Sequence, residues 1–151
     1  MDSYDRKILA ELQSDGRLSI TELADRVGLS LSPCHRRVRA LEDSGVIGKY
    51  RAHLNHSALG LNFSALIFVT MREGDQAAIS RFEKALLEIP EIIQAQRLFG
   101  DPDYILNILT NDVRTFQKLY DDKLSSLPGV QRLISTLVMK SLIQDRAIPL
   151  I

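Results

Sequence analysis

Hydrogen-bonding and cationic side chains gather between residues 30 and 51 of the chain. Arginine can donate paired hydrogen bonds to guanine, and hydroxyl or imidazole groups can bond to either edge of a base or to phosphate. A helix turns by about 100° per residue, which would set these polar side chains opposite Cys34, Val38 and Leu41, with Arg37 at the boundary. A helix so divided can read the major groove of DNA. The candidate DNA-binding residues are Ser30, Ser32, His35, Arg36, Arg37, Arg39, Lys49 and Arg51.

Three short helices are predicted to position this polar face. Apolar residues recur at helical spacing within Tyr4–Gln13. Ser19-Ile20-Thr21-Glu22 has the form of a capping box, which begins a second helix that ends at Gly28. The third helix is expected to have Ser32 as its N-cap and Pro33 at its first helical position. A tight turn that contains glycine, between two short helices, predicts a helix-turn-helix.

An exposed strand is expected after the third helix. The stretch from Val46 to Leu54 alternates in character, and Lys49 and Arg51 share one side of it. A strand in this place is typical of a wing, whose cations lie close to phosphates and position the domain without reading sequence. The sequence therefore predicts a winged helix-turn-helix over residues 1–54, followed by a linker over residues 55–62.

Residues 63–151 are expected to form a second domain with the order strand, helix, strand, strand, helix, strand. The two halves resemble each other, since Phe82 and Ile89-Pro90 in the first correspond to Phe116 and Leu127-Pro128 in the second. A duplicated βαβ unit predicts a ferredoxin-like sandwich, and therefore an α+β chain. The expected strands are 63–72, 92–99, 104–110 and 130–143, and the expected helices are 76–88 and 113–126.

In a sheet with one face exposed to water, apolar and polar residues alternate along each strand, and the two central strands expected here lack this alternation. The segments Ala65–Val69 and Tyr104–Leu109 are almost continuously apolar. Because both helices should cover one face, the other face is expected to be covered by a second copy of the chain. A symmetric dimer would present two recognition helices to a palindromic site on double-stranded DNA.

The charge, the apolar runs and the single cysteine of the chain argue against several other classes of protein. The 19 basic and 19 acidic residues cancel, so the basic stretch from Arg36 to Arg51 is a local patch on a neutral chain. The longest apolar runs fall short of a membrane span and no signal peptide precedes the first helix, which predicts a cytoplasmic protein. The single cysteine excludes an internal disulfide, and adjacent Cys34 and His35 point apart on a helix. We expect no catalytic residues, no metal site and no cofactor.

The chain resembles the leucine-responsive regulator/AsnC family, also called feast/famine regulators. The resemblance is carried by Asp5–Leu9, Leu23–Ser30, Ser32–Ile47 and Gly100–Leu106, in that order, and by the closing Ile148-Pro149-Leu150. It implies a winged helix-turn-helix joined to a domain that senses small molecules, often amino acids. It also implies dimers that assemble into tetramers, octamers or larger rings.

The resemblance further places an effector pocket between dimers, near the Gly100–Tyr104 turn, where Pro102 stands in place of a frequent aromatic residue. The implied pocket residues are Gly100, Asp101, Asp103, Tyr104, Asp112, Thr136, Leu137 and Val138. A free amino acid needs an acceptor for its ammonium and N–H donors for its carboxylate, which an aspartate and the backbone at Gly100 could supply. Alternatively, the aspartates of this turn bond local N–H groups.

Two other functions are compatible with the pattern. The protein could be an architectural one that wraps DNA without an effector. It could also be an enzyme, because the family resembles sirohaem decarboxylases, although all three histidines precede residue 60 and no catalytic triad or phosphate-binding glycine loop is present.

Overall fold

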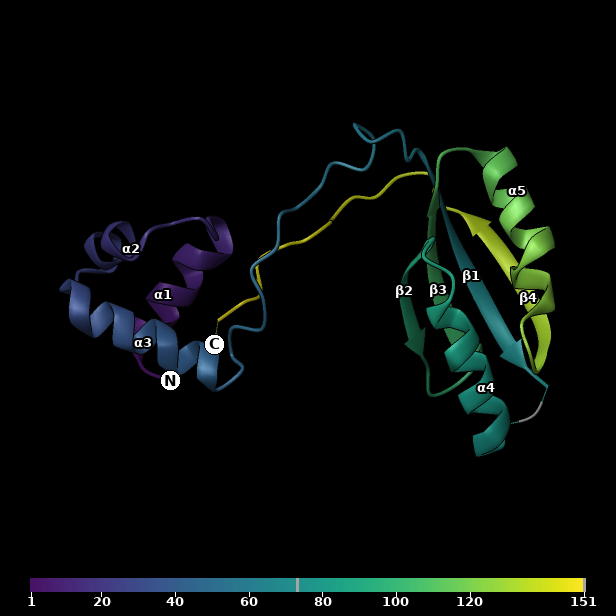
Figure 1. Cartoon of the computed structure of the whole chain (residues 1–151), viewed down its shortest axis with the longest axis horizontal. Coiled ribbons are helices and arrows are strands. Elements are labelled where there is room, and N and C mark those ends of the chain that lie inside the picture. The colour runs from purple at the N-terminus through teal and green to yellow at the C-terminus, as the bar shows by residue number, and fades with distance from the viewer. Residues whose placement is uncertain (73, 151) are drawn as a thin grey trace. The chain divides into compact units, whose positions relative to one another are not determined.

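The computed structural model of the chain describes residues 1–72 and 74–150 (Figure 1). These residues form two compact units. One comprises Met1–Leu54 together with residues 142–150, and the other comprises Asn55–Ser141. The sequence predicts that residues 142–150 belong to the second domain, whereas in the structure they pack with the first unit. No described helix combines the length and the apolar character that crossing a bilayer requires.

The first unit holds the three expected helices, α1 (Ser3–Ser14), α2 (Ile20–Val27) and α3 (Leu31–Asp43). The predicted capping box of α2 is confirmed: the Ser19 hydroxyl accepts from the Glu22 N–H, and the Glu22 carboxylate accepts from the Ser19 N–H. The residue that ends α2, Gly28, has a φ of 74°, a left-handed conformation that favours glycine. Apolar residues of all three helices form one core: Ile8, Leu9, Leu23, Ala24, Val27, Cys34, Val38 and Leu41.

The start of α3 differs from the prediction by two residues. Ser30, not Ser32, is the N-cap, so the helix begins at Leu31 and Pro33 occupies its third position. Proline fits there because the first four N–H groups of a helix have no partner within the helix. Leu31 and Ser32 therefore belong to the exposed first turn of α3 rather than to the loop before it.

The strand predicted after α3 is wrong. Residues 46–54 have no strand partner; instead the Ile47 N–H donates to the Leu41 carbonyl at 3.0 Å and closes the end of α3. A strand needs a second strand to pair its backbone. Here the apolar side chain of Ile47 packs against the core of the first unit instead. The Tyr50 hydroxyl donates to the Glu42 carboxylate at 3.0 Å. We call residues 46–54 the wing segment.

Residues 142–150, which we call the tail, are hydrogen-bonded to α1. The Gln13 side-chain amide donates to the Ile148 carbonyl at 3.1 Å, and the Ile148 N–H donates back to the Gln13 oxygen at 2.6 Å. Leu150 packs against the core of the first unit. A two-point amide pair and one apolar contact thus explain why these residues belong to this unit.

The second unit is the expected βαββαβ arrangement, so the predicted α+β class and ferredoxin-like topology are confirmed. Its elements are β1 (Phe63–Met71), α4 (Gln76–Leu87), β2 (Ile92–Arg97), β3 (Tyr104–Thr110), α5 (Val113–Asp122), the short 3-10 helix η1 (Leu124–Ser126) and β4 (Val130–Leu137). The strands pair antiparallel in the order β2-β3-β1-β4, with β1 and β3 central as predicted. The last strand ends at Leu137, earlier than expected.

The two faces of this sheet are covered differently. Both helices lie on one face (Figure 1), where alternate residues of β1 and β3 are buried with Phe82, Leu86 and Leu119. The other face carries the residues between them, which are only half-buried and include Leu66, Phe68, Ile105 and Leu109. We call this second surface the open face.

Candidate DNA interface and ligand site

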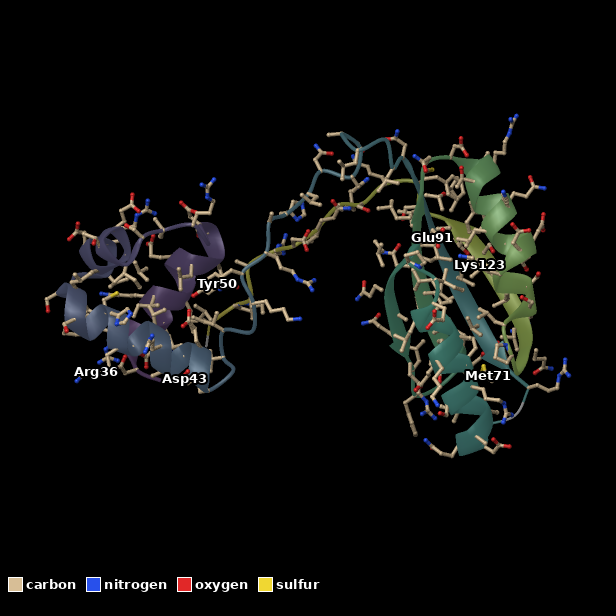
Figure 2. All side chains as sticks on the ribbon, in the orientation of Figure 1. Arg36, Asp43, Tyr50, Met71, Glu91 and Lys123 are labelled. Carbon is tan, nitrogen blue, oxygen red and sulfur yellow. The ribbon has the colours of Figure 1, made fainter. Side chains whose placement is uncertain are left out.

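Four of the predicted DNA-binding residues share the exposed side of α3. Ser32, His35, Arg36 and Arg39 are all exposed, while Cys34, Val38 and Leu41 of the same helix are buried. Figure 2 shows the Arg36 side chain directed away from α1 and α2. Ser30, the N-cap, is also exposed and its hydroxyl makes no capping bond. This surface offers hydroxyl, imidazole and guanidinium groups next to a helix N-terminus, which favours anions such as phosphate.

Arg37 does not join this surface. Its guanidinium lies 2.7 Å from the Asp2 carboxylate and 2.8 Å from that of Asp5, and 5.6 Å from the centre of the Tyr4 ring. The hydrogen bonds to Asp5 and Asp2 raise the pKa of Arg37. The pKa of Asp2 is lowered, first by the N–H of Asp5 and further by Arg37. Arg37 thus ties α3 to the start of α1, in contrast to the DNA-binding role expected from the sequence.

The sequence has a feature from which the contact of Arg37 with α1 could have been predicted. Asp2 is the N-cap of α1 and forms a capping box with Asp5, three residues later. Two carboxylates at a helix N-terminus form a cation site for any arginine that packs across from them. The polar pattern of α3 alone could not reveal which arginine that is.

The wing segment presents the other two predicted cations. Lys49 and Arg51 are exposed on either side of Tyr50 in the sequence. The pKa of Tyr50 is raised by burial and by its bond to Glu42, so at neutral pH its hydroxyl stays a donor to α3. This bond holds the wing segment to α3 although no strand is formed.

Leu31 also lies on this exposed surface, although it is not among the predicted DNA-binding residues. It was interpreted as part of the turn, yet it is the first residue of α3 and its side chain is 53% exposed. The available signal was the Gly28 stop, which, with a turn of only two residues, would have set the helix start at Leu31.

The predicted effector residues fall into two groups at opposite ends of the second unit's sheet. Gly100, Asp101, Asp103 and Tyr104 lie where β3 begins, since Tyr104 pairs with Val69. The second group lies where β3 ends, because Thr110 pairs with Phe63 and Leu137 with Ala65; it consists of Asp112, Thr136, Leu137 and Val138. Tyr104 and Thr110 are six residue steps apart along β3, or about 20 Å. A single amino acid cannot contact both groups within one chain.

Two of the three candidate aspartates have structural partners. The Asp103 carboxylate accepts from the Met71 N–H at 2.7 Å, which ties the β2–β3 turn to β1. Asp112 is the N-cap of α5 and accepts from the Thr115 N–H at 2.7 Å, the first cause of its lowered pKa. Tyr104 is buried on the helix face, where its hydroxyl donates to Glu83 at 2.8 Å; burial and Glu83 raise its pKa to about 12.

The third candidate aspartate, Asp101, is exposed. It lines a depression together with Thr70, Gln131 and Arg132, with a volume of about 470 Å³. A carboxylate and a guanidinium in one depression form a pair of opposite charges. This pair complements a zwitterion, whose ammonium and carboxylate lie on neighbouring atoms.

Comparisons with known proteins agree with this architecture. Residues 1–47 match the family model described as winged helix-turn-helix DNA-binding, and residues 64–148 match the Lrp/AsnC ligand binding domain. The chain is 36% identical to the proline dehydrogenase transcriptional activator of Rhodobacter capsulatus, over 97% of this chain and 96% of the relative. It is 38% identical to the leucine-responsive regulatory protein of Escherichia coli, over 96% of this chain and 88% of the relative.

Solved structures show the same likeness over both units. The crystal structure of a transcriptional regulator from Neisseria meningitidis in complex with L-Met has a TM-score of 0.93 and 36% identity, covering 99% of this chain and 96% of that one. An AsnC family regulator from Agrobacterium tumefaciens has a TM-score of 0.92 and 29% identity, covering 99% and 97%. With both of its parts matched, this chain belongs to the Lrp/AsnC family and is a transcriptional regulator with a DNA-binding helix-turn-helix and a ligand-binding domain.

Proposed function

We propose that the exposed side of α3 reads bases in the major groove of an operator, with Lys49 and Arg51 on the flanking phosphates. The observation that carries this proposal is that the arginines of α3 have different surroundings. Arg37 is engaged by two carboxylates of α1, whereas Arg36 and Arg39 are exposed and aligned with His35 and Ser32. Bidentate arginine contacts with guanine are the commonest specific contacts of such helices.

We further propose that the operator is palindromic and is bound by a symmetric dimer. The open face of the sheet supports this proposal, because Leu66, Phe68 and Ile105 are only half-buried there, and Ile134 on the neighbouring strand is 45% exposed. A second copy laid on this face would remove those side chains from water. Two recognition helices related by a two-fold axis would read half-sites about one helical turn apart.

The proposed effector is an amino acid bound where copies of the chain meet. Asp101 would accept from its ammonium and Arg132 would donate to its carboxylate. The L-Met bound by the Neisseria meningitidis regulator supports an amino acid as the class. The separation of the two groups of candidate residues supports a site made by two chains, and Phe99, fully exposed before the Gly100 turn, is a side chain that a further copy would bury. Assembly of dimers to an octamer is part of this proposal.

One selection experiment tests these proposals together. The purified protein would be used to select genomic fragments, with and without each free amino acid. Enrichment of a palindromic site that one amino acid strengthens or weakens supports the reader and the sensor and identifies the ligand. Broad, sequence-independent enrichment that no amino acid changes would instead favour the architectural role.

A catalytic role has a different signature. The relatives described above are a transcriptional activator and a leucine-responsive regulatory protein. This similarity favours a regulatory protein. A sirohaem decarboxylase would bind a tetrapyrrole, so the absorbance spectrum of the purified protein after addition of a tetrapyrrole is the discriminating measurement. We expect the absorbance bands of the tetrapyrrole to be the same with and without the protein; bands shifted by the protein would contradict the regulatory assignment.

A further inference from the structure

The first residue of α3 carries an apolar side chain into water. Leu31 is 53% exposed. Among the residues that the structure describes, the core of the first unit takes in Leu29, on the other side of the N-cap Ser30, but not Leu31. Leaving a leucine half in water forfeits part of the gain from burial. The folding of this unit therefore does not account for an apolar residue at this position.

The position of Leu31 on the helix places it among the candidate base-reading side chains. Residues four apart on a helix share a face, so Leu31 lies one turn before His35 and two turns before Arg39. All three are exposed. In a helix-turn-helix, the N-terminal residues of the second helix are the ones that contact base edges. Leu31 thus stands at the end of α3 that enters the groove first.

The chemistry of the groove limits what a leucine can recognise there. Guanine, cytosine and adenine present donors and acceptors in the major groove, and thymine adds the one apolar group, its 5-methyl. Leucine has neither donor nor acceptor in its side chain, so it can discriminate only through that methyl group.

We propose that Leu31 packs against the 5-methyl group of a thymine in the operator and is a specificity-determining residue of this regulator. The inference rests on the proposed placement of α3 in the major groove. The Leu31 contact would be apolar, whereas the other side chains proposed for this surface would form hydrogen bonds with base edges. A base pair with thymine is then expected opposite the first turn of α3, next to the pairs read by His35 and Arg36.

Replacement of thymine by deoxyuridine tests the inference, because it removes the methyl group and leaves every hydrogen-bonding edge intact. The duplex is the site enriched in the genomic selection, with thymines replaced one at a time. At one position we expect the wild-type Kd to rise about fourfold, the effect of losing one buried methyl group. The other replacements should leave the Kd within a factor of about two.

Leu31→Ala supplies the second half of the test. This variant should bind the unmodified duplex more weakly and should no longer distinguish thymine from uracil at that position. Leu87→Ala, on α4 of the second unit, is the matched control, since Leu87 is also exposed, at 84%, and the same atoms are removed. It should retain the full uracil effect, and equal unfolding temperatures of the three proteins would show that Leu31→Ala is folded.

The outcomes separate this inference from the proposal on which it rests. Wild-type binding to the unmodified duplex with no uracil effect at any position would overturn the Leu31 contact and leave the DNA surface standing. An undiminished uracil effect in Leu31→Ala would also overturn it. Failure of the wild-type protein to bind any selected duplex would overturn the DNA surface and the Leu31 contact together.

Discussion

Three arginines lie close together on α3, and their surroundings give them different roles. Arg36 and Arg39 are exposed, whereas Arg37 is held by Asp2, Asp5 and the ring of Tyr4. A residue's type and its place in a motif therefore do not decide its role. The surroundings of Arg37 depend on the start of α1, where the carboxylates of Asp2 and Asp5 lie within hydrogen-bonding distance of its guanidinium.

Substitution of neighbouring arginines should separate DNA binding from stability. Arg36→Ala is expected to weaken binding at the specific site by about 1–3 kcal/mol while the unfolding temperature stays unchanged, because it removes a base contact and no internal one. Arg37→Ala should lower the unfolding temperature, because it leaves Asp2 and Asp5 without their cation. Titration of operator DNA and thermal unfolding of both variants check this. Equal losses of affinity with equal stability would show that Arg37 also contacts DNA.

At the scale of elements, the capping box of α2 contributes to stability in a way that depends on pH. The Ser19 hydroxyl donates to Glu22 at 2.7 Å, and this bond, followed by that from the Ser19 N–H, lowers the pKa of Glu22 below its ordinary 4.5. A lowered pKa in the folded state means that the bond stabilises the fold above about pH 4.5 and that this contribution is lost as the pH falls through the lowered pKa.

Ser19→Ala should therefore cost stability mainly at neutral pH. Loss of a serine N-cap costs about 1 kcal/mol, or roughly 4–8 °C in the unfolding temperature of a unit of this size. The difference from wild type should narrow between about pH 7 and about pH 3 as Glu22 takes up its proton. Thr21→Ala, beside the box, is the control and should unfold no earlier than wild type. A difference that widens toward acid would contradict the assignment.

The wing segment should act through charge alone. Lys49→Ala is expected to weaken binding by a similar factor on all sequences and to reduce the slope of log K against log salt by about 1, because it removes one phosphate contact. Lys84→Ala, on α4 of the second unit, should leave the slope unchanged. Binding isotherms at several salt concentrations, on the operator and on unrelated DNA, measure both slopes. A loss confined to the operator would mean that Lys49 reads a base.

How far the sequence predicts these elements depends on the range of the forces involved. The capping box at Ser19, the stop at Gly28 and the strand Tyr104–Thr110 follow from neighbouring residues, and all were predicted. The tie of Arg37 to α1 and the pairing of Gln13 with Ile148 join residues far apart in the chain, and local pattern could not show them. The wing segment alternates like a strand, but the partner that would make it one is missing among the described residues.

The effector residues illustrate the same limit. Motif and order placed Gly100–Tyr104 at a strand start and Asp112 at a helix start, as found. The predicted strand Tyr104–Thr110 already separates these two groups, whereas the place of Leu137 at the Asp112 end depends on the pairing of β4 with β1, which the sequence does not state. The position of Arg132 beside Asp101 likewise depends on the pairing of β4 with β1.

For the whole molecule, the open face of the sheet sets the expected assembly. Phe68→Glu places a charge at the centre of that face and should convert the protein to single chains of 17.0 kDa, because the dimer would have to bury an unpaired carboxylate. Leu87→Glu, at an 84% exposed position on α4, should leave the assembly intact. Sedimentation velocity gives the masses and circular dichroism the fold. A folded Phe68→Glu protein that still dimerises would place the interface elsewhere.

The return of the tail to α1 gives the two units an order of completion during synthesis. A ribosome adds about 5–20 residues per second from the N-terminus, so α1 to α3 emerge first and the whole of Asn55–Ser141 follows. Ile148 and Leu150, which Gln13 and the first core require, are made after both. The residues of the DNA-reading unit are therefore the first to be synthesised, and its tail contacts are among the last that can form. Gln13 therefore gains its Ile148 partner only after all of Asn55–Ser141 has been synthesised.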